Sequence, residues 1–554
     1  MAISIAVGDE SFEEIRKSGL YYVDKTELIY DLVHNAKNKV TLFTRPRRFG
    51  KTLNMSMLES FFDINRDSGH LFEGLDIVQH EEFCKEWMNQ YPVLSISFKD
   101  VDGLDFESAK KMLSSTLART FLKYSGLADH ENVSPSDKVR FSQLLAETDD
   151  VAVIKNALDT IMRMMNAVYG KPVILLIDEY DVPLAKASEK NTAHNRYYEQ
   201  MLDMIKGMLS IALKTNEYLK FAVVTGCLRI AKESIFTGTN NFQSYSVLED
   251  RFSRYFGFTQ TEVDDLLGAA ELTDKAEIFR AWYDGYVFGN TPVYCPWDLV
   301  SYISALLYDR EAEPQNYWRN TSGNDVIKVF VGKHKVSRKF ETLMNGGTIT
   351  ETISDELTYD TLHESEQNLW SILLMTGYLT KADPSAKGKT IALKIPNSEI
   401  AGIFQDTVAI YFREKLDVSK QEKLMDALWA GDADQASKIM SELLRKTISY
   451  MDYHEDYYHA FLAGIFVGRG YETESNKEKG LGRPDIQLFD QEHDRAMIIE
   501  TKKTVSKMQM NKECDEALKQ IVDKEHAADL YEEFAEVICY GISFFQKSAM
   551  IKKL

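Results

Sequence analysis

Proline, cysteine and long apolar runs are all scarce in this chain. Only 11 prolines occur in 554 residues, and no low-complexity tract marks a linker, so domain boundaries must be inferred from changes of pattern. The five cysteines form no CxxC pair, which excludes a disulfide framework or a zinc ribbon and indicates a reducing compartment. The apolar run at residues 173–177 is too short to span a bilayer, and the N-terminus has no basic segment before an apolar one. These absences predict a cytoplasmic protein with no membrane partner.

Basic residues are outnumbered by acidic ones. The chain has 65 lysines and arginines against 85 aspartates and glutamates, a formal net charge of -20 at pH 7. This balance argues against a generally basic nucleic-acid coat protein, although it allows a local nucleic-acid site. With 44% hydrophobic residues, the chain can bury roughly three or four separate cores.

Short apolar, β-branched runs alternate with helix-like stretches in the first half of the chain. The runs lie at residues 39–44, 92–98, 172–178 and 219–226. Apolar strands separated by helices are typical of an α/β fold whose parallel sheet is covered on both faces. The pattern then becomes mostly helical, with a hairpin expected at residues 381–395, before a second, smaller α/β unit. We therefore predict three domains, at residues 1–260, 261–445 and 446–554.

A phosphate-binding loop is expected after the first of these strands. The sequence RPRRFGKT lies between that strand and a helix-like stretch. In a P-loop, backbone N–H groups and a helix N-terminus hold the phosphates, a lysine contacts them, and a serine or threonine binds Mg²⁺. Gly50, Lys51 and Thr52 follow this order, but the strict pattern has glycine where this chain has Arg45. Because Gly-Lys-Thr tripeptides are common, a chance match stays open for the loop alone.

The strand at residues 173–177 is followed by two carboxylates, Asp178 and Glu179. This is the form of a Walker B element, in which Asp178 would hold Mg²⁺ through water and Glu179 would polarise the attacking water. The alternative is a core strand that ends in acidic turn residues. Together with the loop, the element predicts a site for ATP and Mg²⁺.

The strand at residues 219–226 carries Thr225 near its end, and Arg229 follows it. Thr225 could sense the γ-phosphate, and Arg229 could offset the charge that develops in phosphoryl transfer. A threonine at a strand end is also common as a turn or cap residue. Both interpretations of Thr225 stay open.

Six segments together carry a family resemblance. They are RPRRFGKT, YVDKT, LLIDEYDVPL, TGCLRIAKESIF, WYDGYVFG and YCPWDLV. In these segments the chain resembles the bacterial AAA-ATPase-like family, whose members commonly carry a C-terminal PD-(D/E)XK nuclease-superfamily domain. The resemblance implies an AAA-like P-loop NTPase sheet, a helical lid or connector, and a restriction-endonuclease-like α/β domain. Because the loop of this family commonly lacks the first glycine, Arg47 and Arg48 become candidates for phosphate contact, the alternative being solvated loop cations.

A metal-dependent cleavage site is expected near the C-terminus. Asp485 leads one strand-like run, and after a turn Glu500 and Lys502 close the next, giving the pattern D-x14-E-x-K. Side chains at positions i and i+2 of a strand share a face, so Glu500 and Lys502 point together while Thr501 points away. The two carboxylates could hold Mg²⁺, and Lys502 could orient the attacking water. The alternative is a surface hairpin with charged ends.

The resemblance adds two residues to this site. PD-(D/E)XK nucleases often have a helix acid before the aspartate, and of Glu474 and Glu478 the latter is the better candidate metal ligand. Gln520 matches the later helix glutamine of resolvase-like branches, whereas alone it would be interpreted as an exposed helix residue.

The charge of the C-terminal segment limits how it could bind DNA. Residues 471–554 contain 13 basic and 17 acidic residues, a net charge of -4, so the segment has no overall attraction for a phosphate backbone. DNA contacts would then come from Arg483, Lys502, Lys503 and Lys507, from another part of the chain, or from a second subunit of a homo-oligomer.

We predict an ATP-hydrolysing protein coupled to Mg²⁺-dependent phosphodiester cleavage of nucleic acid, with DNA favoured over RNA. One alternative is a nucleotide-regulated switch or sensor, related to defence or mobile elements. Another is a nucleic-acid-binding scaffold with a silent nuclease site.

Overall fold

A computed structural model of the chain describes most of its length. It describes residues 3–189, 197–229, 242–318, 338–344, 346–354, 357, 365–404, 407, 418–447, 458, 461–462, 465–466, 472–475, 485–491, 493–524, 527–528 and 530–554. The chain divides into two compact units, one with residues 1–318 and 350–399 and one with residues 319–349 and 400–554. No helix in the described ranges is long and apolar enough to cross a membrane.

The first unit contains a five-stranded sheet in the order β2-β3-β4-β1-β5. Its strands are β1 (Val40–Thr44), β2 (Val93–Ser97), β3 (Val173–Asp178), β4 (Leu219–Gly226) and β5 (Phe242–Tyr245). All neighbouring strands are parallel, and every residue of β1 and β3 is buried. The sheet confirms the parallel α/β fold that the apolar runs predict.

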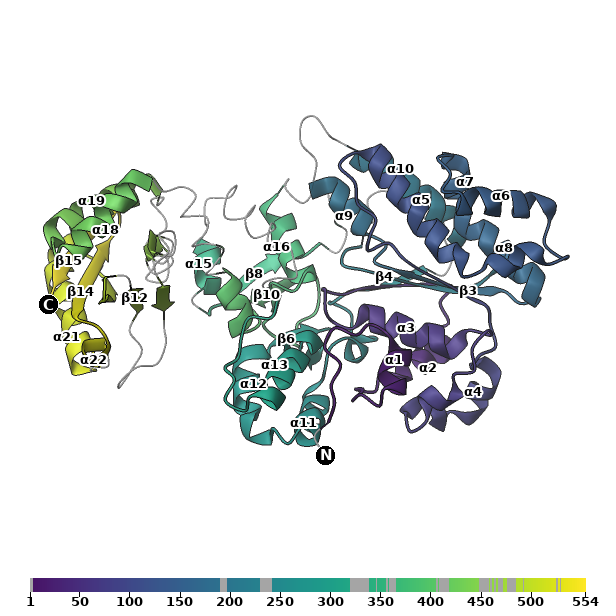
Figure 1. The fold of residues 1–554 in the computed structure, drawn as a ribbon, viewed down its shortest axis with the longest axis horizontal. Helices are drawn as coiled ribbons and strands as arrows, with labels where there is room; N and C mark the ends of the chain where they lie inside the picture. Colours follow the sequence, from purple (N-terminus) through teal and green to yellow (C-terminus); the bar gives the residue numbers. More distant parts are fainter. Residues whose placement is uncertain are drawn as a thin grey trace. The chain divides into compact units, whose positions relative to one another are not determined.

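Helices cover both faces of this sheet (Figure 1). On one side lie α1 (Phe12–Lys17), α2 (Glu27–Tyr30), α3 (Lys51–Phe62) and α4 (Glu81–Trp87). On the other side lie α5 (Phe106–Leu122), α6 (Pro135–Leu145), α7 (Val151–Lys155), α8 (Ala157–Tyr169), α9 (Val182–Glu189) and α10 (Tyr198–Leu213). Buried residues of α5, α6, α8 and α10 form one apolar core with residues of β1 to β4.

Local sequence signals set several helix ends. Asp105 and Ser108 form a capping box at the start of α5. Thr259 and Glu262 do the same for α11 (Gln260–Ala269), since each side chain accepts a backbone N–H that the first turn leaves unpaired. Gly170 ends α8 in the left-handed conformation, with φ of 64°, which glycine adopts without steric cost.

The remaining elements of the first unit mix helices with short strands. They are α11, α12 (Ala276–Tyr283), β6 (Tyr286–Phe288), β7 (Thr291–Val293), α13 (Pro296–Tyr308), β8 (Ile349–Thr352), α16 (Glu366–Met375), β9 (Thr380–Lys381) and β10 (Thr390–Lys394). β9 and β10 pair antiparallel, which confirms the hairpin predicted at residues 381–395. The other strands, β6, β7 and β8, were not predicted, because three or four residues show too little alternation to be recognised.

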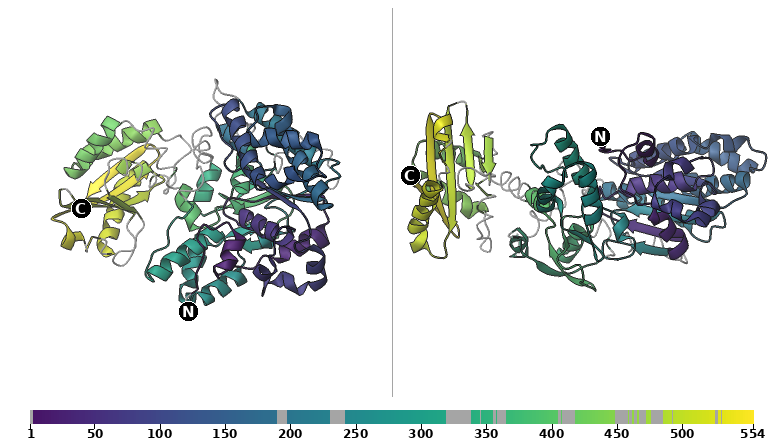
Figure 2. Two further views of the ribbon diagram at one scale, coloured as in Figure 1. Left: turned by 45° about the vertical axis from the view of Figure 1, so that its right-hand side comes forward. Right: turned by 90° about the horizontal axis from the view of Figure 1, so that it is seen from below.

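The second unit contains a five-stranded mixed sheet in the order β11-β12-β13-β14-β15. Its strands are β11 (Glu472–Ser475), β12 (Ile486–Asp490), β13 (Arg495–Lys503), β14 (Glu536–Phe545) and β15 (Ser548–Lys553). β13 and β14 run parallel and the other pairs antiparallel. Both views of Figure 2 show the C-terminal strands, coloured yellow, side by side in this sheet.

Five helices complete the described part of the second unit. They are α15 (Arg338–Met344), α18 (Val418–Trp429), α19 (Ala433–Thr447), α21 (Met510–Asp523) and α22 (Leu530–Glu533). α19 covers the edge strand β15, where Ser437 Oγ accepts the N–H of Ile551 at 2.8 Å and Ser441 Oγ accepts that of Ala549 at 2.9 Å. The middle segment at residues 261–445 therefore contributes elements to both units.

Candidate active sites

The RPRRFGKT loop connects β1 to the N-terminus of α3. Gly50 caps α3 in the left-handed conformation with φ of 79°, and no heavy atom lies within 4 Å of the position that its Cβ would take. Lys51 Nζ donates to the backbone carbonyls of Arg45 at 3.1 Å and Pro46 at 2.9 Å. Gly50 and Lys51 thus lie at a helix N-terminus, the position that they have in a phosphate-binding loop.

Arg45, which replaces the first glycine of the strict pattern, is fully buried. Its Nη1 donates to the carbonyls of Thr44 at 2.9 Å and Tyr245 at 2.8 Å. The guanidinium also lies 5.0 Å from the ring centroid of Phe256 and 5.4 Å from that of Phe288. Burial lowers the pKa of Arg45 to about 9. The side chain points into the protein and ties the loop to β5, so the loop reaches its shape without a glycine there.

Asp178 is the meeting point of the three predicted strand ends. Its Oδ2 accepts a hydrogen bond from Thr52 Oγ1 at 2.8 Å, and its Oδ1 accepts one from Thr225 Oγ1. This convergence follows from the strand order, because β4 lies between β1 and β3 and parallel strands end at the same edge of a sheet. The structure therefore brings together Thr52, Asp178 and Thr225.

Glu179 follows Asp178 in a left-handed backbone conformation, with φ of 51°. Its backbone N–H donates to Thr225 Oγ1 at 3.4 Å. Burial raises the pKa of Glu179, and Asp178 and Asp181 raise it further, while Lys51 and Arg47 act in the opposite direction. A carboxylate with a raised pKa is a better proton acceptor, and strained backbone is common at functional positions.

Asp181 was not singled out by the sequence analysis, yet it organises the end of β4. Its carboxylate is buried and accepts the backbone N–H groups of Cys227 at 3.0 Å and Leu228 at 2.9 Å. The Tyr180 hydroxyl donates to the Leu228 carbonyl at 2.8 Å. A third acid three residues after Asp178, in an otherwise apolar stretch, was the signal that could have found it.

The three predicted arginines take different positions. Arg47 acts electrostatically on Glu179 and Cys227, so it belongs with the Asp178 cluster. Arg48 instead stacks on Trp297, with its guanidinium 3.7 Å from the ring centroid. Arg229 is half-buried and directly follows the backbone segment that Asp181 holds.

Arg48 also faces a buried acidic cluster that the sequence analysis did not predict. Asp298 and Glu399 are both fully buried, and burial raises the pKa of each carboxyl, that of Glu399 further because Asp298 lies beside it. Arg48 lowers the pKa of Asp298, and its carbonyl accepts the thiol of Cys295 at 3.8 Å. Glu399 Oε1 accepts the backbone N–H of Trp318 at 2.9 Å.

The donor atoms of the first site suit both Mg²⁺ and a nucleotide phosphate. Thr52 and Asp178 offer oxygen ligands, which Mg²⁺ prefers in proteins. Lys51 and the open Gly50 position at the start of α3 offer the cation and the backbone cradle that phosphates need. These residues fit the predicted cofactors.

The predicted residues Asp485, Glu500, Lys502 and Gln520 come together at the C-terminal half of β13. Glu500 is fully buried, and its Oε1 accepts a hydrogen bond from Gln520 Nε2 at 2.9 Å. Lys502 Nζ donates to Gln520 Oε1 at 2.7 Å. The β12–β13 register, in which Ile486 faces Ile499, places Asp485 opposite Glu500. Gln520 of α21 is thus a bridge between the lysine and the buried carboxyl, and not an exposed helix residue.

The prediction that Thr501 points away from the site is wrong. Its backbone N–H and hydroxyl both donate to Asp485 Oδ2, at 2.7 and 2.9 Å. Alternation of side chains applies within a regular strand, but Asp485 lies at a bend just before β12, so its carboxylate can reach along β13 to the next residue. Thr501 therefore holds Asp485 in place.

Two of the three predicted acidic metal ligands of this second site, Asp485 and Glu500, lie within the described residues. Burial raises the pKa of Glu500, and the neighbouring Asp485 raises it further, so the pair favours a bound cation. Two carboxylates on adjacent strands suit Mg²⁺. The predicted third ligand, Glu478, lies outside the described residues, and within the described ranges no group of three His, Cys, Asp or Glu residues could hold a metal ion.

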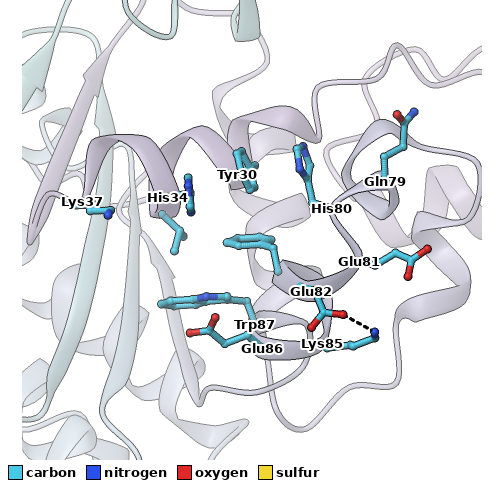
Figure 3. Close-up of a pocket in the computed structure, with 12 residues that line it drawn as sticks. Tyr30, His34, Lys37, Gln79, His80, Glu81, Glu82, Lys85, Glu86 and Trp87 are labelled. Atoms are coloured by element: carbon cyan, nitrogen blue, oxygen red, sulfur yellow. Dashed lines mark hydrogen bonds and ion pairs between the residues drawn. The ribbon is translucent and has the colours of Figure 1, made fainter.

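A separate pocket of about 980 Å³ lies between Asp31–Ala36, the helical segment that follows α2, and helix α4 (Figure 3). Tyr30 stacks on His80, with ring centroids 3.8 Å apart, and on His34, with centroids 4.7 Å apart. His80 Nε2 also lies 2.8 Å from Glu27 Oε1.

Comparisons with known proteins agree with the motifs. Residues 6–236 match the family model described as predicted AAA-ATPase, and residues 453–554 match that of the PD-(D/E)XK nuclease superfamily. A protein of Azotobacter chroococcum mcd 1, described as an uncharacterized protein in the vnfD 5' region, is 26% identical over 504 residues, which cover 88% of this chain and 87% of the relative. The resemblance drawn from the motifs is confirmed: the chain joins an N-terminal AAA-ATPase-like domain to a C-terminal domain of the PD-(D/E)XK nuclease superfamily.

Proposed function

We propose that the first unit binds and hydrolyses ATP with Mg²⁺. Lys51 would exchange its bonds to the Arg45 and Pro46 carbonyls for phosphate oxygens. Thr52 and Asp178 would hold the metal, which offsets phosphate charge. Glu179 would accept a proton from the attacking water, a role that its raised pKa favours.

We propose that the second unit cleaves phosphodiester bonds of DNA. The observation that carries this function is the Lys502–Gln520–Glu500 hydrogen-bonded chain beside Asp485. Asp485 and Glu500 would hold Mg²⁺, which supplies positive charge to the scissile phosphate. Lys502 would orient the attacking water, and Gln520 would position both Lys502 and Glu500.

The two activities are proposed to be coupled through the start and end of the connector. The chain leaves the first unit after Trp318 and again after Glu399, and these two residues are hydrogen-bonded to each other. Arg48 of the phosphate loop faces Glu399 and its neighbour Asp298. A change in the loop on nucleotide binding would therefore act on both points where the chain passes to the nuclease unit.

A second contact supports the same route. Gly377 has φ of +87°, and a Cβ there would lie 2.8 Å from the Trp318 ring and 3.0 Å from Pro46 Cβ. Pro46 of the phosphate loop and Trp318 therefore pack against the same backbone position.

We further propose that residues 1–260, 261–445 and 446–554 act as ATPase, connector and nuclease in a cytoplasmic protein. We also propose that a homo-oligomer supplies additional DNA contacts.

The test is cleavage of plasmid and single-stranded DNA with Mg²⁺ and ATP, with a non-hydrolysable ATP analogue, and without nucleotide. The wild type is expected to cleave, Asp485→Ala to lose cleavage but keep ATP hydrolysis, and Lys51→Ala to lose hydrolysis. Equal cleavage under all three nucleotide conditions would show that the coupling is wrong. Absence of cleavage in every condition would leave the switch or the silent scaffold as the function.

A further inference from the structure

Two of the most exposed apolar side chains of the protein lie on one short connection in the nuclease unit. Val505 is 86% exposed and Met508 is 92% exposed. Both belong to residues 504–509, which connect β13 to α21. β13 carries Glu500 and Lys502 and α21 carries Gln520, so this connection joins the two elements that build the candidate cleavage site.

Hydrogen bonds hold this connection in one shape. The buried Thr504 donates its N–H to the Phe544 carbonyl at 2.9 Å, which anchors the connection to β14. The Thr504 hydroxyl donates to the Ser506 carbonyl at 3.1 Å and to Gln509 Oε1 at 3.2 Å. Met508 N–H donates to Ser506 Oγ at 3.3 Å. The apolar side chains are therefore presented outward by a preorganised turn.

The surroundings of this turn are basic in a chain that is acidic overall. The stretch TKKTVSKMQMNK at residues 501–512 contains four lysines and no acidic residue, although the whole chain carries a net charge of -20. Among the described residues, no ion pair involves Lys503 or Lys507, whereas Lys512 of the same stretch pairs with Glu516. The lysines on both sides are complementary to the phosphates of a DNA backbone. The apolar side chains between them are complementary to the bases.

We propose that Val505 and Met508 form an apolar wedge that enters a groove of duplex DNA beside the cleaved phosphate, with Lys503 and Lys507 on the flanking phosphates. This inference rests on the proposed nuclease function. Proteins that kink duplexes insert aliphatic side chains such as Met, Leu and Ile between base steps. Proteins instead bind single strands by stacking the bases on aromatic rings, and residues 504–509 contain no aromatic residue. The aliphatic tips therefore favour a duplex as the partner.

The reach of the wedge follows from strand geometry. A strand rises about 3.3 Å per residue, so Val505 lies at most roughly 17 Å from Glu500 along β13. Successive phosphates on one strand of DNA are separated by about 3.4 Å along the axis. The wedge would then act within roughly five base steps of the cleaved bond, where unstacking can widen access for the metal site.

The inference is tested with the full-length Val505→Ser/Met508→Ser variant. The control is Val522→Ser, because Val522 lies on α21 of the same unit and is also exposed, at 54%. Binding to a 30-base-pair duplex and to its single strand is measured by fluorescence anisotropy, in an Asp485→Ala background to prevent cleavage. A second duplex carries 2-aminopurine at spaced positions, whose fluorescence rises when a base unstacks.

The double variant is expected to bind the duplex about ten- to hundredfold more weakly, because each apolar side chain loses its burial. Its salt dependence should be unchanged, since the lysines remain, whereas Lys507→Gln should lower the salt slope by about one. Wild-type binding should raise 2-aminopurine fluorescence, and the double variant should lose this rise. The control should behave as wild type in every arm.

Three outcomes would overturn the wedge. They are equal duplex affinity of the double variant and the wild type, no 2-aminopurine signal on wild-type binding, and tighter wild-type binding to the single strand than to the duplex. Cleavage by the chain with Asp485 intact is scored separately. Cleavage without any effect of the double variant would refute the wedge alone, and a wedge signal without cleavage would refute the proposed nuclease function alone.

Discussion

Gly226 is the position where the packing of the nucleotide site allows the sharpest prediction. It is the last residue of β4 and pairs with Thr44 of β1. A Cβ at this position would lie 2.6 Å from Asp181 Oδ1 and 2.7 Å from Cε1 of Tyr180. Neither neighbour can move freely, because Asp181 holds two backbone N–H groups and the Tyr180 hydroxyl bonds the Leu228 carbonyl. Gly226→Ala therefore overpacks a fixed cluster.

The expected cost is about 3 kcal/mol, the upper part of the range for an overpacked core. The first unit contains about 370 residues, and an unfolding entropy of about 2.1 cal/mol/K per residue makes 1 kcal/mol equivalent to about 1.3 °C. Gly226→Ala should then lower the melting temperature of the first unit by about 4 °C. It should also weaken ATP binding, since the displaced Asp181 and Tyr180 directly follow Asp178 and Glu179.

Gly268→Ala is the matched control, because it makes the same chemical change in the same unit with no steric conflict. Gly268 lies in the exposed part of α11 and has no heavy atom within 4 Å of its Cβ position. Alanine should stabilise that helix by about 0.5–1 kcal/mol. Calorimetry and a titration with a fluorescent ATP analogue measure both variants. A melting temperature of Gly226→Ala within 1 °C of the wild type would refute the packing argument.

Three further predictions concern Glu399, Gln520 and Arg45. The pKa of Glu399 is raised above its ordinary value of 4.5, so the folded state is favoured while this carboxyl is protonated, and stability should fall as the pH rises above about 4.5. Glu399→Gln keeps an acceptor for the Trp318 N–H and should flatten that fall in urea titrations between pH 6 and 9, whereas an unchanged slope would contradict the shift. Gln520→Ala should raise the Mg²⁺ concentration for half-maximal cleavage about ten- to hundredfold with little change in melting temperature; a loss of stability without a Mg²⁺ effect would make Gln520 merely structural. Arg45→Lys should cost about 2–3 kcal/mol in urea unfolding, because an ammonium cannot reproduce the contacts of the planar guanidinium with the Phe256 and Phe288 rings in a fully buried site; stability equal to wild type would argue against that role.

The sequence by itself determined the fold class and the main site residues, because those features depend on local pattern. Apolar runs of five or more residues, such as β1 and β3, predict buried parallel strands whatever their partners are. The order of strand, Gly-Lys-Thr and helix placed Lys51 and Thr52 at a helix N-terminus, and the i, i+2 spacing of Glu500 and Lys502 placed them on one face. None of these statements requires knowledge of distant contacts.

Only the tertiary structure decided which distant residues serve these sites. Asp298 and Glu399 are about 100 positions apart in sequence, and no local pattern indicates that they meet beside Arg48. Thr501 obeys the alternation rule by sequence, but the bend at Asp485 turns the carboxylate toward it. Arg45 departs from the P-loop pattern, and the reason, its bond to the Tyr245 carbonyl of β5, exists only once β5 pairs with β1. Such roles arise from contacts between residues that are distant in sequence, and local sequence patterns do not specify which distant residues meet.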